Sequence, residues 1–179
     1  MKKKALALAL VLALTLLVAG VVGGTLAWLT DQTAEVKNTF TVGDINIGLT
    51  ETTADYKMVP GNTIAKDPTV TVKANSEACW LFVKVTESTD LKDFITYAIA
   101  EGWTALPGVD GVYYREVPAS AADQTFSVLA GDAVTVKSDV TRTMLETAKT
   151  DAPTLTFKAY AIQKDHFATA DAAWVEVSK

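Results

Sequence analysis

The chain has 179 residues, a formal net charge of −5 and a single cysteine, Cys79. This length accommodates one domain with a sizeable core. One cysteine excludes an internal disulfide, so the folded part must be held together by core packing or by assembly. The negative charge argues against nucleic acid or an anionic lipid surface as the partner, because both need a basic patch.

The first 27 residues have the pattern of a secretory signal peptide. Lysines at positions 2–4 precede an apolar stretch over residues 5–22, and Thr25 and Ala27 supply small residues for a cleavage site. We expect cleavage between Ala27 and Trp28, which removes the three lysines and changes the net charge from −5 to −8. The apolar stretch approaches the ~18 residues that span a bilayer, so an uncleaved anchor is the alternative.

Residues 28–39 are expected to form an N-terminal strand or arm, which we call the arm, and residues 40–179 have the pattern of a β-sandwich domain. Short runs rich in Thr, Val, Ile and aromatics alternate with polar residues and are separated by turn residues. Residues 80–83 are apolar at every position, which indicates a central strand covered on both faces. The expected strands lie near residues 40–49, 66–72, 80–85, 113–117, 126–128, 134–136, 155–162 and 174–177.

Two kinds of connection are expected between these strands. Residues 59–62, with Pro60 and Gly61, predict a turn, and residues 129–132 predict a hairpin between the strands on either side.

Two stretches predict helices. In the first, Asp90 is a candidate N-cap and Gly102 a candidate stop. In the second, Ser138 is a candidate N-cap and the helix ends before Pro153. The apolar positions are Leu91, Phe94, Ile95 and Ile99 in the first, and Val140, Met144, Leu145 and Ala148 in the second.

The fold that these elements predict is mainly β. We expect a jelly-roll-like β-sandwich with two short connecting helices, preceded by an N-terminal apolar signal helix.

The search for catalytic residues centres on His166 and Cys79. His166 is the sole histidine and lies in a polar stretch, so no His-Glu-x-x-His motif exists and a zinc protease of the common helical type is excluded. Cys79 precedes an apolar strand, which favours a buried, inert thiol. A nucleophilic pair of the two residues is the open alternative.

The remaining polar and aromatic residues form no catalytic or cofactor-binding constellation, and we expect neither a cofactor nor a metal. A calcium ion held by loop carboxylates is an alternative, although no EF-hand pattern occurs. The tryptophans could form a carbohydrate platform, but their spread along the chain favours core or interface positions. The acidic residues considered are Asp31, Asp44, Asp67, Asp90, Asp93 and Asp132, and the tryptophans are Trp28, Trp80, Trp103 and Trp174.

Several blocks of the sequence share the pattern of one protein family. They are Gly24-Thr-Leu-Ala-Trp-Leu-Thr-Asp31, Asn38-Thr-Phe-Thr-Val-Gly43, Ile45-Asn-Ile-Gly-Leu-Thr-Glu51, Pro60-Gly61 with Ile64-Ala-Lys-Asp-Pro68 and Val70, Cys79-Trp-Leu-Phe-Val-Lys-Val85, and Ala173-Trp-Val-Glu-Val177. These blocks resemble those of the TasA/camelysin family of secreted bacterial proteins. The N-terminal blocks are the more specific ones, and the second region and the chain end add to the likeness.

This resemblance implies a jelly-roll subunit of extracellular fibres in a biofilm matrix, released by a SipW-type signal peptidase. The N-terminal segment of one subunit would add as a strand to the sheet of the next, which here corresponds to the arm, with Trp28, Leu29 and Val36 as its apolar side chains. The partners implied are further copies of the chain, with other matrix proteins or a polysaccharide as further candidates. A camelysin-like surface metallopeptidase and a membrane-anchored surface binding module are the alternatives.

Overall fold

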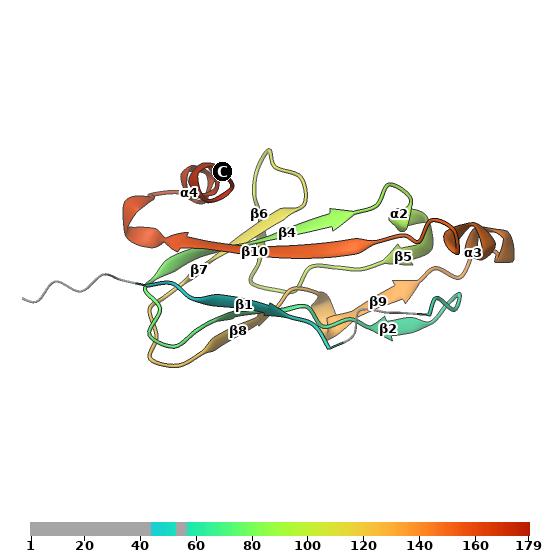
Figure 1. The fold of residues 1–179 in the computed structure, drawn as a ribbon, viewed down its shortest axis with the longest axis horizontal. Helices are drawn as coiled ribbons and strands as arrows, with labels where there is room; N and C mark the ends of the chain where they lie inside the picture. Colours follow the sequence, from blue (N-terminus) through green and yellow to red (C-terminus); the bar gives the residue numbers. More distant parts are fainter. Residues whose placement is uncertain (1–43, 53–56) are drawn as a thin grey trace, which may run out of the picture. The chain divides into compact units, whose positions relative to one another are not determined.

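The computed structural model describes residues 44–52 and 57–179 of the chain, shown in Figure 1. The signal segment, its expected cleavage site at Ala27 and Trp28, and the arm lie outside the described residues. Within the described ranges, no helix combines the length and the apolar character needed to cross a membrane.

Strands make up most of the regular structure of the described residues. They are β1 (Ile47–Thr50), β2 (Thr63–Ala65), β3 (Thr69–Val72), β4 (Cys79–Glu87), β5 (Ile95–Thr96), β6 (Thr104–Ala105), β7 (Val112–Val117), β8 (Gln124–Ser127), β9 (Ala133–Val136) and β10 (Leu155–Gln163). The helices are α2 (Leu91–Phe94), α3 (Arg142–Ala148) and α4 (Ala170–Val177), with 3₁₀ turns η1 (Ala130–Asp132) and η2 (Lys164–His166).

These strands form three antiparallel sheets. A four-stranded sheet has the order β10-β4-β7-β6, the β3 sheet has the order β1-β3-β8, and the β9 sheet has the order β2-β9-β5. All the pairings between neighbouring strands are antiparallel. The expectation of a mainly β fold is therefore confirmed.

Strand β4 is covered on both faces, as residues 80–83 predicted. On one face Leu81 and Val83 share a core cluster with Val70 and Val72 of the β3 sheet, and all four side chains are fully buried. On the other face, Phe82 packs in a second cluster with helix α4. Consecutive residues of a strand point to opposite faces, so both cores need an apolar residue at every position of this strand.

A third core cluster joins the β9 sheet to helices α2 and α3. Its fully buried members are Leu129 and Val136, and Val140 and Ala148 pack beside them at either end of the α3 segment. These positions match the buried face expected for the second helix. The N-cap is Thr141 rather than Ser138, because its side-chain oxygen accepts a hydrogen bond from the backbone N–H of Met144 at 3.3 Å.

The first predicted helix is wrong in length, because α2 ends at Phe94. Ile95 and Thr96 instead pair with Val136 and Thr135 of β9. Both residues are β-branched and favour extended backbone, so sheet pairing outweighs the helical spacing of their neighbours. Asp90 occupies the N-cap position but makes no side-chain capping bond.

The predicted terminal strand at residues 174–177 is also wrong, because these residues lie in helix α4. Thr169 caps this helix by accepting a hydrogen bond from the N–H of Ala172 at 3.3 Å. Ala170, Ala173 and Trp174 lie on its buried face, at helical spacing. The described residues therefore contain three α-helices rather than the two expected.

The turn at residues 59–62 is confirmed, whereas the hairpin at residues 129–132 is wrong. Gly61 has a φ of +79°, and the N–H of Asn62 donates to the carbonyl of Val59 at 3.0 Å. Residues 129–132 connect β8, which belongs to the β3 sheet, to β9, which belongs to a different sheet. Val128 and Leu129 are fully buried in different core clusters, so the chain crosses between sheets here instead of folding back.

Candidate functional site at the edge of strand β10

Strand β10 is a long edge strand. All nine of its residues pair with β4 on one side, and no strand of residues 44–52 or 57–179 pairs with its other side. In an antiparallel strand, successive residues direct their N–H and C=O groups to opposite edges. Roughly half of the backbone groups of β10 therefore point to an edge where another strand can bind.

The side chains of β10 are less buried than the number of apolar residues in this strand predicts. Leu155, Phe157, Ala159 and Ala161 pack against the first core cluster, yet every residue of β10 keeps part of its surface exposed. The neighbouring β4 has buried side chains from Cys79 through Val83. A strand with apolar side chains that are only partly covered gains hydrophobic burial when a further strand is added beside it.

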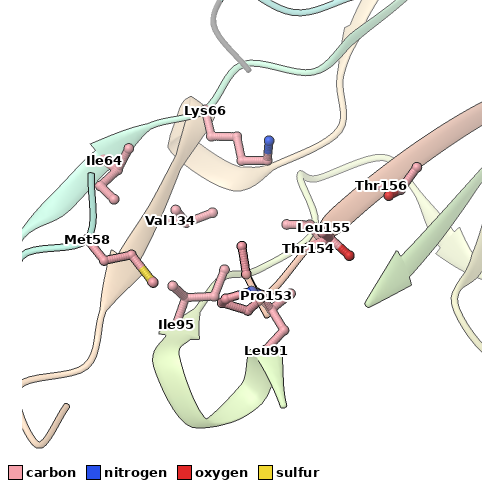
Figure 2. Close-up of a pocket in the computed structure, with 11 residues that line it drawn as sticks. Met58, Ile64, Lys66, Leu91, Ile95, Val134, Pro153, Thr154, Leu155 and Thr156 are labelled. Carbon is pink, nitrogen blue, oxygen red and sulfur yellow. The ribbon is translucent and has the colours of Figure 1, made fainter. Parts of the chain in front are cut away.

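A cavity of about 430 Å³ opens beside the beginning of β10, and Figure 2 shows its lining. Met58 and Ile64 form one side, and Ile95 and Val134 belong to the strands of the β9 sheet. The segment from Pro153 to Thr156 forms the opposite side. The volume lies in the range of about 300–1,000 Å³ typical of binding sites, and most of the lining is apolar.

A second cavity of about 290 Å³ lies between β1 and β10. It is lined by Leu49, Thr50 and Glu51 at the end of β1, and by the segment from Leu155 to Phe157. Leu155 and Thr156 line both cavities. The start of β10 thus borders open volume toward two other sheets, and we call the two cavities together with the free edge of β10 the β10 groove.

An ion pair connects the two cavities of the β10 groove. Lys66 lines the larger cavity and Glu51 the smaller one, and their side-chain N and O atoms are 2.6 Å apart. Their side chains are 9% and 24% exposed, so solvent screens this pair less than a surface pair. The Lys66 ammonium also lies 5.4 Å from the ring centroid of Phe157, which places a cation–π contact beside β10.

The residues proposed for catalysis are not assembled into a reactive site. His166 is exposed at the end of η2, and Cys79 is fully buried in the first core cluster. Burial raises the pKa of the Cys79 thiol to about 11, which keeps it protonated near neutral pH and opposes a nucleophilic role. In the described part of the chain, no group of three or more His, Cys, Asp or Glu side chains is arranged to hold a metal ion.

The tryptophans within the described residues are core residues and form no exposed carbohydrate platform. Trp80, Trp103 and Trp174 are 5%, 9% and 8% exposed. Two of their indole N–H groups donate to backbone carbonyls, those of Phe167 and Ser127. Trp28, Leu29 and Val36, named for cleavage or assembly, lie outside the described residues.

Comparison of the chain with family models, with curated proteins and with solved structures gives no match.

Sequence reasoning predicted β10 as a strand but did not identify it as an edge. Thr156 and Lys158 interrupt its apolar residues, whereas residues 80–83 of β4 are apolar throughout. Alternation of this kind indicates a strand with one solvated face, but it carries no information on whether the hydrogen-bonding edge of the strand is paired. The lining of the two cavities comes from segments far apart in the sequence, so no local pattern indicated it.

Proposed function

We propose that this chain is a secreted structural subunit of extracellular fibres in a biofilm matrix, in which the β10 groove accepts the N-terminal arm of the next subunit. The observation that carries the proposal is the outer edge of β10, nine residues long, with which no strand of residues 44–52 or 57–179 pairs and beside which two cavities lie. The resemblance to the TasA/camelysin family supports it, and with it a jelly-roll topology and processing by a SipW-type signal peptidase.

The physical basis of the proposed contact is strand addition. Each backbone hydrogen bond formed along β10 contributes about 0.5–1.5 kcal/mol net. The apolar side chains of the arm, at Trp28, Leu29 and Val36, supply groups that fill cavities lined by residues such as Ile64 and Leu155. Donor and acceptor are different surfaces of the same chain, so the contact is heterologous and extends into a fibre.

Cleavage between Ala27 and Trp28 would then control assembly. While residues 1–27 remain attached, the apolar stretch holds the arm at the membrane, and the arm is not free to reach a neighbour. After cleavage, a segment with exposed apolar side chains gains by pairing with an open sheet edge. Mass spectrometry of the mature N-terminus tests this step: a species that begins at Trp28 supports release, and one that retains Lys2 supports the anchored alternative.

A disulfide cross-linking experiment tests the acceptor edge. One preparation carries Leu29→Cys in the arm and a second carries Thr156→Cys in β10, both with Cys79→Ala. When the preparations are mixed and oxidised, we expect a cross-linked heterodimer, which can form only between subunits. The matched control replaces Thr156→Cys with Thr104→Cys, since Thr104 is also an exposed threonine but lies on β6, the opposite edge of the same sheet. Equal cross-linking at both edges would argue against the β10 groove.

Deletion of residues 28–39 tests the donor. We expect the processed protein without this arm to remain folded and monomeric and to form no fibres in electron micrographs at increasing concentration. Fibres of equal length with and without the arm would exclude its role as donor strand.

A further inference from the structure

A third cavity, of about 390 Å³, is lined by residues of β4, β7 and the α2–β5 segment, and it shares Leu91 and Ile95 with the larger cavity of the β10 groove. Glu87 at the end of β4 and Tyr113 near the start of β7 line one part of it. Lys92 and Tyr97 come from the α2–β5 segment, and Lys137 follows β9. We call this cavity the tyrosine pocket. Its volume falls within the range of about 300–1,000 Å³ typical of sites for small molecules.

The tyrosine pocket carries an excess of positive charge on an otherwise acidic chain. Lys92 is exposed and Lys137 half-buried, and neither forms an ion pair with another residue of the described ranges. The backbone N–H of Lys137 donates to the carbonyl of Phe94 at 2.9 Å, which fixes the start of its side chain. Among the described residues that line the pocket, Glu87 is the acidic one, so the lining holds two lysines and one carboxylate.

Two half-buried tyrosines give the pocket aromatic surface and polar groups together. The hydroxyl of Tyr97 donates a hydrogen bond to the carboxylate of Glu87. Burial and this bond raise the pKa of Tyr97, so its hydroxyl stays protonated in the physiological range. Tyr113 lines the same pocket. Tyrosine combines an apolar ring with a polar tip, which suits a ligand that has both a ring face and hydroxyl groups.

We propose that the tyrosine pocket binds a uronic acid unit of an acidic polysaccharide. The carboxylate of the sugar would lie between the ammonium groups of Lys92 and Lys137. The sugar ring would pack on Tyr97 and Tyr113, and its hydroxyls would donate to Glu87. The edge strand at this pocket is β5, which has only two residues, so an added peptide strand would gain few backbone hydrogen bonds here. The charged and aromatic residues used here, Lys92, Lys137, Tyr97 and Tyr113, do not line the cavities of the β10 groove, so this proposal does not rest on the proposed fibre contact.

The test measures binding of a galacturonic acid trisaccharide to the purified full chain by titration calorimetry or NMR. Galactotriose is the matched neutral probe, and hexaglutamate is the acidic peptide probe. Saturable binding of the uronate is expected, together with shifts of the Tyr97 and Tyr113 resonances. Because glutamine cannot form a charge-assisted hydrogen bond to the carboxylate of the sugar, we expect the double variant Lys92→Gln/Lys137→Gln to bind at least about tenfold more weakly.

The control variant makes the same charge change away from the pocket, at the exposed residues Lys57 and Lys84. We expect Lys57→Gln/Lys84→Gln to keep the affinity of the unmodified chain. The proposal is overturned if the uronate does not bind saturably, if galactotriose or hexaglutamate binds as tightly, or if both double variants lose affinity equally. Because fibre assembly is measured separately, failure here leaves the role of the β10 groove unaffected.

Discussion

Substitution of Gly111 tests the close approach of β4 to the loop that precedes β7. Gly111 has a φ of +71°, and a Cβ at this position would lie 2.4 Å from the carbonyl oxygen of Val85. The backbone N–H of Val85 also donates to the carbonyl of Gly111 at 2.7 Å. An added methyl group must therefore push apart two backbone segments that are joined by a hydrogen bond.

Gly108 provides a matched control in the same loop. Its φ is +72°, almost the same as that of Gly111, but a Cβ at Gly108 would have no atom within 4 Å. Alanine at either site adopts the left-handed conformation at a cost of about 1–2 kcal/mol. Only Gly111→Ala adds a steric conflict, which costs about 1–3 kcal/mol for overpacking, and a weakened hydrogen bond worth about 1 kcal/mol.

We expect Gly108→Ala to lower the free energy of unfolding by about 1–2 kcal/mol and Gly111→Ala to lower it by about 3–6 kcal/mol. The measurement is denaturant unfolding of the two variants and the unmodified chain, followed by tryptophan fluorescence. The effect of alanine on the entropy of the unfolded chain is the same at both sites and cancels in the comparison. If the free energies of unfolding of the two variants agree within about 0.5 kcal/mol, the close contact between Gly111 and Val85 does not limit the packing of β4 against the loop before β7.

Three further predictions concern the core and a helix cap. Burial raises the pKa of Cys79 from 9.0 to about 11, so the protonated thiol stabilises the fold below pH 9, and this stabilisation is lost as the pH rises through 11. The difference in unfolding free energy between the unmodified chain and Cys79→Ala should therefore change between pH 9 and pH 11 and stay constant below pH 9. Phe82 is fully buried, and its ring centroid lies 5.3 Å from that of Trp174. Phe82→Ala should therefore lower the free energy of unfolding, measured with denaturant, by about 3–5 kcal/mol, whereas Phe82→Leu should lower it much less. Thr169→Ala removes the acceptor for the N–H of Ala172 and should lower the free energy of unfolding by about 1 kcal/mol, whereas Thr169→Ser should retain most of the stability. Equal decreases in the two variants would argue against the cap.

Local patterns in the sequence predicted most of the strands but not their ends or partners. Residues 80–83 predicted a strand buried on both faces, because a continuous apolar run is needed when both faces meet a core. The four residues 174–177 could not be assigned in the same way, since an apolar run as short as Trp-Val-Glu-Val occurs in both short strands and amphipathic helices. The wider spacing of Ala170, Ala173 and Trp174 was the better indicator, and it matches helix α4.

Local patterns were sufficient to predict a mainly β fold and a buried cysteine, because apolar alternation and turn residues act over a few positions. The packed fold was needed to show that β10 is an edge strand among the described residues, that β8 and β9 belong to different sheets, and that two cavities meet at Leu155. Each of these features depends on which strands pair across long sequence separations. Pairing is fixed by the packing of whole sheets, and a residue's neighbours in the sequence carry little information about it.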